Sequence, residues 1–176
     1  LRSDDGGLTF SAVTLPITNA FQHVRGQAGT FIILPNGHTT GLRSTDGGAS
    51  WSSITVPSGP FDLWGVGIGK WLFKNSSTGY SISVDNGTSW SSTSPPAALK
   101  SAIGFKGIIV AAYSGASTNV AYSEDAGATW ANALLPASVT DGKLLNLNGV
   151  LYLYGSALVH FSLDGKRWQG SGATVT

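Results

Sequence analysis

Short apolar runs alternate with short polar segments along the whole chain. The clearest runs are Phe-Ile-Ile-Leu at residues 31–34, Ile-Ile-Val-Ala-Ala-Tyr at 108–113 and Val-Leu-Tyr-Leu-Tyr at 150–154. They have the length and the β-branched or aromatic content of strands, and the Gly and Asn-Gly residues between them suit hairpin turns. No helix-length stretch has the 3.6-residue apolar spacing of an amphipathic helix. The pattern therefore predicts an all-β chain.

A polar motif returns at nearly constant intervals between these runs. It reads Ser-x-Asp-x-Gly-x-Ser/Thr-aromatic, and successive copies begin 39 to 41 residues apart. A proline follows the aromatic residue by six positions in the first four copies. A period near 40 residues is typical of a repeat protein. The motif residues are Ser3, Asp5, Gly7 and Phe10; Ser44, Asp46, Gly48 and Trp51; Ser83, Asp85, Gly87 and Trp90; Ser123, Asp125, Gly127 and Trp130; and, one residue shorter, Ser162, Asp164, Gly165 and Trp168.

Each repeat has room for four strands. In the second repeat we expect them at residues 61–69, 70–75, 78–84 and 89–93, with the motif in the turn between the third and the fourth. The second strands are apolar on both sides, so they need a packed sheet on each face. Four-stranded antiparallel sheets stacked around an axis form a β-propeller. We predict this fold for residues 1–176 as a single domain or fragment, with repeats at about 1–16 (partial), 17–57, 58–96, 97–136 and 137–176.

The five motifs resemble Asp-boxes, the repeats of bacterial neuraminidases and of many other propellers. The resemblance covers the whole chain and implies the propeller fold. The residue types also suit a tight turn, because a short carboxylate accepts bonds from nearby backbone amides and glycine adopts positive φ. A calcium loop would need several oxygens around one ion, whereas each motif offers one regularly spaced carboxylate. We therefore interpret the motif residues as structural.

The resemblance does not extend to the neuraminidase catalytic residues. That family's activity implies an arginine cluster, a tyrosine-glutamate pair and an acid/base aspartate, but the one glutamate, Glu124, lies inside a motif turn. Only Asp62 and Asp141 lie outside the motif turns among the nine acidic residues. Each follows a repeat proline by five positions and is expected on the face opposite the motif turns. They form either local turn caps or a carboxylate pair of the kind that glycoside hydrolases use.

The strand count is compatible with several ring architectures. The first three strands of a repeat occur four times, but the fourth occurs five times, because residues 10–15 and 168–176 both qualify. Three arrangements fit: a four-bladed ring with a surplus strand, a five-sheet ring with one incomplete blade, and an arc that other copies or a missing segment complete. The chain also lacks methionine and opens directly on a motif. We therefore expect either a homo-oligomer or part of a larger chain, since an open arc exposes an apolar face.

Composition excludes several classes of function. Charged residues make up 11% of the chain and the net charge is +1, which leaves no basic stripe for nucleic acid. No apolar run approaches the length of a membrane span. Cysteine is absent, and the three histidines lack the spacing of metal ligands, so we expect no metal and no cofactor.

The remaining candidates lie in the loops between second and third strands. His38, Lys74, Asn75 and Tyr113 combine polar groups with an aromatic ring, a mixture that suits a glycan or a protein partner. We expect a non-catalytic binding or structural module of an extracellular, cell-surface or virion protein, such as a phage tail or fibre. The alternatives are a fragment of a sialidase-like or other glycoside hydrolase that uses Asp62 and Asp141, and a pure assembly scaffold.

Overall fold

The computed structural model describes all residues except 18–20, 36–38, 60–61, 156–157 and 175–176. The described residues form strands and turns without a helix, and the strands make four antiparallel sheets of four. The sheets contain β1 (Phe21–Gln27), β2 (Thr30–Pro35), β3 (Thr40–Ser44) and β4 (Ser52–Thr55); β5 (Asp62–Gly65), β6 (Trp71–Lys74), β7 (Tyr80–Ser83) and β8 (Ser91–Thr93); β9 (Leu99–Phe105), β10 (Ile108–Tyr113), β11 (Ala116–Ser123) and β12 (Ala131–Thr140); and β13 (Lys143–Leu147), β14 (Val150–Gly155), β15 (Leu158–Ser162) and β16 (Gln169–Thr174).

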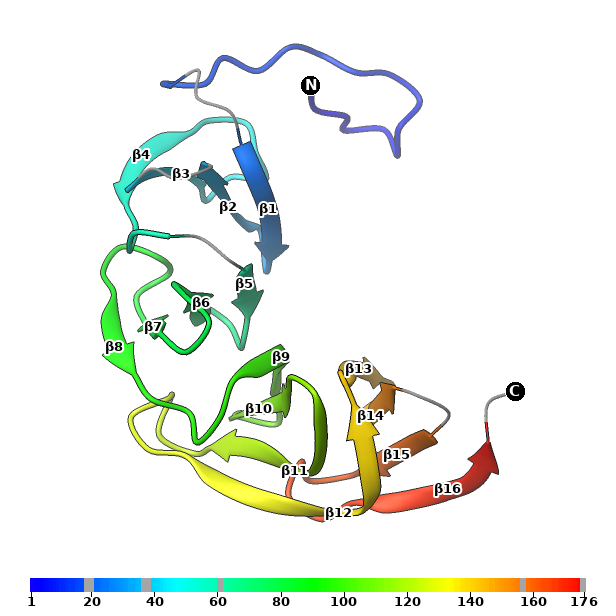
Figure 1. Cartoon of the computed structure of the whole chain (residues 1–176). Helices are drawn as coiled ribbons and strands as arrows, with labels where there is room; N and C mark the ends of the chain where they lie inside the picture. The colour runs from blue at the N-terminus through cyan, green and yellow to red at the C-terminus, as the bar shows by residue number, and fades with distance from the viewer. Residues whose placement is uncertain (18–20, 36–38, 60–61, 156–157, 175–176) are drawn as a thin grey trace.

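The four sheets are the blades of a β-propeller, as the sequence predicted (Figure 1). Within each blade the strands follow one another in chain order. The first strands β1, β5, β9 and β13 neighbour one another on the inner side, and the fourth strands lie on the outer side. The blades follow an arc, and the first and the fourth do not meet (Figure 1). All four strands of the second blade lie within their predicted ranges.

Three apolar cores hold consecutive blades together. Trp71 and Phe73 of β6 face the first blade, whereas Leu72 between them faces the third. This alternation is the ordinary two-residue period of a strand, and it explains why the second strands are apolar on both sides. All three side chains are fully buried. Burial of one such side chain contributes about 1.5–3 kcal/mol, so packing between blades is the main stabilising term.

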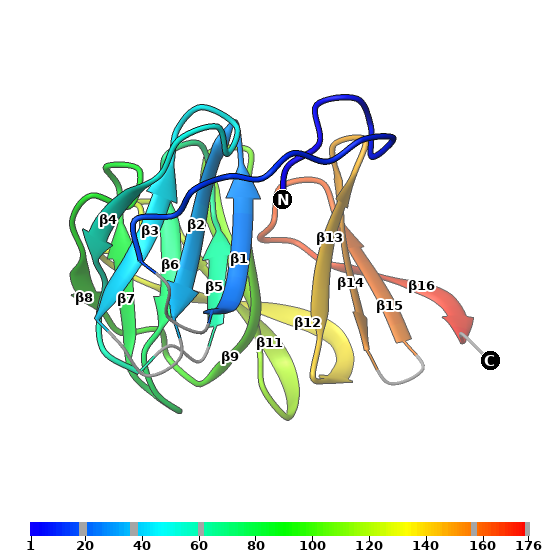
Figure 2. The ribbon, with the colours of Figure 1, turned by 90° about the horizontal axis from the view of Figure 1, so that it is seen from above.

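The first motif turn packs outside the four blades. Residues 1–15, here called the N-terminal hairpin, run across the open end of the arc beside the first blade (Figures 1 and 2). Arg2 and Ser11 exchange two backbone hydrogen bonds of 2.9 Å. The strand expected at residues 10–15 is therefore reduced to one bridge at Ser11. No helix in the described part of the chain is long and apolar enough to cross a bilayer.

Candidate functional site

Each motif builds a turn closed by its own side chains. In the second copy, the Asp46 carboxylate accepts bonds from the backbone N–H of Ser50 and from the hydroxyls of Ser44 and Ser50. The Ser44 hydroxyl in turn accepts the N–H of Gly48 at 2.8 Å. The first, third and fourth copies repeat this arrangement around Asp5, Asp85 and Asp125. The motif aspartates thus satisfy backbone groups of their own turns.

The fifth turn is shorter and uses the same chemistry. The Asp164 carboxylate accepts the N–H groups of Lys166 and Arg167, both at 2.8 Å. The Ser162 hydroxyl accepts the N–H of Gly165. Because the fifth motif is one residue shorter, its carboxylate binds different backbone amides, but it still closes the turn.

The hydrogen bonds donated to these carboxylates lower their pKa values. The Ser89 hydroxyl, followed by the Ser89 N–H, lowers the pKa of Asp85 to about 2, and Thr129 does the same for Asp125. The pKa values of Asp5 and Asp46 are lowered still further. The largest cause is the hydrogen bond from the hydroxyl of Thr9 to Asp5 and from that of Ser50 to Asp46. All four groups are ionised at neutral pH, as acceptors of several bonds should be.

The motif glycines are also contact points between blades. Gly87 has φ +82°, and a Cβ added there would lie 2.6 Å from the Ile32 side chain of the first blade. Gly165 has φ +77°, and its Cβ would lie 2.8 Å from Val110 of the third blade. These glycines are required by backbone conformation and by packing together.

The motif aromatic residues anchor the blades in different ways. The Trp130 indole donates to the Thr93 hydroxyl of the second blade at 2.8 Å, and Trp168 is buried between the third and fourth blades. The Trp90 ring meets Phe73 edge to face, with 5.5 Å between centroids. Phe10 is mostly exposed.

Asp62, one of the two candidate catalytic residues, forms an ion pair between blades. Its Oδ1 lies 3.0 Å from Nη2 of Arg25 on β1, and the same oxygen accepts the Leu63 N–H. The Arg25 Nε donates to the Leu63 carbonyl at 3.1 Å. Arg25 and Asp62 thus join the first blade to the start of the second.

Asp141, the other candidate, closes the turn between β10 and β11. Its carboxylate accepts the Gly115 N–H at 2.9 Å, and its own N–H donates to the Gly115 carbonyl. The Gly115 bond, helped by the charge of Lys100, lowers the pKa of Asp141. Both aspartates therefore have local structural partners, and a catalytic role for them stays a hypothesis.

The expected ligand-binding residues are largely engaged in packing. Tyr113 is 7% exposed, lies in the core between the second and third blades, and donates its hydroxyl to Asn132. Burial raises the pKa of Tyr113 to about 12. Lys74 donates to the Leu99 carbonyl of the third blade, and the Asn75 amide donates to Ser81. His38 lies outside the described residues. In particular, the Tyr113 ring is not an exposed platform.

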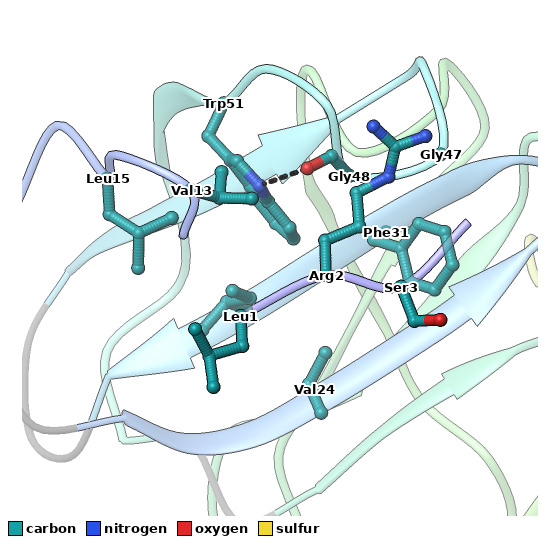
Figure 3. A pocket seen from close by; sticks show the side chains of 11 residues that line it. Leu1, Arg2, Ser3, Val13, Leu15, Val24, Phe31, Gly47, Gly48 and Trp51 are labelled. Carbon is teal, nitrogen blue, oxygen red and sulfur yellow. Dashed lines mark hydrogen bonds between the residues drawn. The ribbon is translucent and has the colours of Figure 1, made fainter. Parts of the chain in front are cut away.

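A pocket that the sequence analysis did not name lies between the N-terminal hairpin and the first blade (Figure 3). It has a volume of about 340 Å³. Val24, Phe31 and Ile33 of the first sheet line one side, and residues 1–3 with Val13 line the other. The signal in the sequence was a motif without three strands before it. Among the described residues, no three His, Asp or Glu side chains gather into a cluster that could hold a metal ion.

The comparisons with known proteins define the class as β-propeller. No family model and no curated protein matches the chain. Three similar solved structures are YCF48 bound to D1 peptide (TM-score 0.62, 17% identity), the GH74 enzyme of Niastella koreensis (0.61, 21%) and YCF48 from Cyanidioschyzon merolae (0.59, 14%). The matches include 94%, 95% and 93% of this chain, but only 58%, 27% and 59% of the length of the three similar chains. The chain thus spans little more than half of the YCF48 proteins and about a quarter of the GH74 enzyme. At these identities the likeness establishes the fold alone.

Proposed function

We propose that the chain is a binding module that recognises a protein partner or a glycan without chemical turnover. The proposal rests on the observation that these carboxylates of the chain are bound by other groups of the chain itself. The five motif aspartates close turns, Asp62 pairs with Arg25, and Asp141 binds Gly115. A glycosidase needs one carboxyl group free to donate a proton and another free to act as base or nucleophile. Side chains held by backbone amides and a guanidinium are poorly suited to those roles.

The proposed recognition surface is the edge of the arc opposite the motif turns. We define this loop face by residues 57–59, 75–79, 94–98 and 114–115. Its exposed side chains are small: Ser77, Thr78 and Ser94 are polar, and Pro96 and Ala97 are apolar. Such surfaces form hydrogen bonds with sugars and with polypeptide backbones, and they need no large apolar area. A peptide-bound YCF48 among the similar structures supports a protein partner as the first choice and a glycan as the second.

The setting we propose is an extracellular, cell-surface or virion protein. Charged residues are few, cysteine is absent, and Gly, Ser and Thr are abundant. Repeated hairpins closed by short side chains give a rigid frame that displays loops on one edge. A phage tail or fibre and a bacterial surface protein both need such a frame for attachment.

The test combines a glycan array with an immobilised peptide library. We expect binding without product formation, at least tenfold weaker in Thr78→Arg, which places a bulky charge on the loop face. Ala128→Arg is the matched control, since Ala128 is also exposed but lies in a motif turn. Binding that is unchanged in Thr78→Arg would overturn the choice of surface. Glycoside hydrolysis that disappears in folded Asp62→Asn or Asp141→Asn would overturn the non-catalytic proposal.

A further inference from the structure

The sequence contains three Asn-Gly pairs, at residues 36–37, 86–87 and 148–149. An asparagine before glycine is prone to deamidation, because glycine has no Cβ and its backbone nitrogen reaches the asparagine side chain without steric hindrance. The first pair lies outside the described residues. The other two pairs differ in the contacts that control this reaction.

Asn86 is held by its side chain and by its backbone. Its Nδ2 donates to the Thr30 hydroxyl at 2.9 Å, and its Oδ1 accepts the Trp71 indole N–H at 3.5 Å. Its backbone N–H donates to the Gly69 carbonyl at 2.8 Å. Thr30 belongs to the first blade and Asn86 to the second, so the side chain cannot turn toward Gly87 without breaking a bond between blades.

The nitrogen of Gly87 is also engaged. It donates to the Ser83 hydroxyl at 2.8 Å, and the residue is buried. A Cβ at Gly87 would lie 2.6 Å from the Ile32 side chain, so the first blade packs directly on this residue. The turn cannot open unless the first two blades separate, and separation exposes their shared apolar core.

Asn148 lies in an exposed two-residue turn. Asn148 and Gly149 join the paired residues Leu147 and Val150, and their φ values are +50° and +79°, as a type I′ turn requires. Within the described part of the chain, the Asn148 side chain has no hydrogen-bond partner. The Gly149 N–H donates to the Asn146 side chain, but at 3.3 Å and at the surface.

The exposure of this turn is a property of the blade and not of its position at the end of the arc. The same turn is Ala28-Gly29 in the first blade and Lys106-Gly107 in the third, and these residues are also exposed with positive φ. The third blade has a neighbouring blade of this chain on each side, and its turn is still uncovered. A Cβ at Gly29, Gly107 or Gly149 would meet nothing within 4 Å.

We infer that Asn148 is a site of spontaneous deamidation. The Gly149 nitrogen attacks Cγ of Asn148 and loses its proton to water, and Nδ2 leaves as ammonia, which closes a succinimide ring. Water then adds to one of the two ring carbonyls and opens the ring. Opening on one side gives aspartate, and opening on the other gives isoaspartate, in which the main chain runs through the former side chain. Water is the only further reactant.

The reaction changes the charge and the length of the turn. A carboxylate replaces a neutral amide, so the net charge of the chain falls by one unit from +1 to zero. Isoaspartate also adds one atom to the main chain between Leu147 and Val150, and a two-residue turn fixes the register of the strands that it joins. The site lies on the edge of the arc that carries the motif turns, so it is independent of the loop face.

The test incubates the whole folded chain at neutral pH and follows tryptic peptides by mass spectrometry. Lys and Arg residues lie between the three Asn-Gly pairs, so trypsin places each pair in its own peptide. We expect conversion of amide to acid at Asn148 to be at least tenfold faster than at Asn86, with aspartate and isoaspartate both formed. In water labelled with heavy oxygen, both products should carry the label. A sample digested before incubation gives the background.

The unfolded chain is the matched control. In urea, Asn86 and Asn148 should react at similar rates, because the same dipeptide is then without its contacts. Folding should therefore slow the reaction strongly at Asn86 and little at Asn148. In the folded chain, Asn146→Ala should speed the reaction at Asn148 because it releases the Gly149 N–H, and Gly149→Ala should slow it because the new Cβ hinders the attack.

Three results would overturn the inference. The first is an equal rate at the two sites of the folded chain, or no conversion at Asn148 over the time in which the unfolded chain reacts. The second is a product that contains aspartate alone, since direct hydrolysis of the amide forms no isoaspartate. The third is a difference between Asn86 and Asn148 that persists in urea, because the contacts of the fold would then not control the reaction.

Discussion

Arg25 and Asp62 form an ion pair of 3.0 Å that joins the first blade of the propeller to the second. The Arg25 Nε also donates to the Leu63 carbonyl, so a single side chain binds both the side chain and the backbone at the start of β5. Lys74 and Ser101 make comparable bonds to carbonyls of the following blades, at Leu99 and Gly142. Polar links of this kind fix the lateral position of blades whose attraction is mainly apolar.

The Arg25–Asp62 pair should contribute little to stability and nothing to chemistry. Both side chains are partly exposed, at 42% and 29%, so a double-mutant cycle with Arg25→Met and Asp62→Asn should give a coupling of about 0.2–1 kcal/mol. Urea unfolding at low and high salt measures it, and salt should reduce the coupling. A coupling that is absent at low salt would contradict the assigned contact.

The motif glycine Gly87 is required by its backbone conformation and by packing, and a comparison with Gly107 separates the two effects. Gly87 and Gly107 have similar positive φ, +82° and +88°, but a Cβ at Gly107 meets nothing within 4 Å. Gly107→Ala should cost about 1–2 kcal/mol for the left-handed backbone. Gly87→Ala should cost roughly 1–3 kcal/mol more, because the new Cβ meets Ile32. Equal losses in the free energy of unfolding would contradict the packing of the turn against the preceding blade.

A buried serine hydroxyl in a motif turn should contribute more to the free energy of unfolding than an exposed one. Ser44 is 2% exposed, and its removal in Ser44→Ala leaves the buried N–H of Gly48 without an acceptor. We expect a loss of about 1–3 kcal/mol in the free energy of unfolding. Ser3→Ala removes the same group from an exposed turn, and we expect a change below about 0.5 kcal/mol. Similar losses in the two variants would mean that burial of the turn does not set its contribution.

Stability should fall with acid in two separate ranges. His160 is 2% exposed and burial lowers its pKa, so below about pH 6.5 the unfolded chain binds a proton that the folded chain excludes. The decrease in the free energy of unfolding between pH 7 and 5 should disappear in His160→Gln. A second loss should begin below about pH 4, because Asp85 and Asp125 keep pKa values of about 2 in the folded state. Thermal melts across pH 2–8 measure both, and stability that increases toward acid would contradict them.

The sequence predicted the fold because its local signals agree. Alternating apolar residues, turn glycines and the 40-residue period all require the same four-stranded unit, and β5–β8 match the ranges expected for it. The site was less accessible to such reasoning. Arg25 and Asp62 are 37 residues apart, and no local pattern links them. Tyr113 lies at a strand end, where only the neighbouring blade decides whether the ring is buried. The pocket depends on how the N-terminal hairpin packs, which no periodicity encodes.

The central claim is that the motif carboxylates hold turns together. The most direct measurement is urea unfolding of Asp85→Asn beside Asp4→Asn, with ligand binding followed in both. Asp85 accepts four bonds within its turn, whereas the Asp4 carboxylate forms an exposed ion pair with Arg2. We predict a clearly lower urea midpoint for Asp85→Asn, an unchanged one for Asp4→Asn, and retained binding in both. An Asp85→Asn protein of undiminished stability that has lost binding or activity would contradict the account.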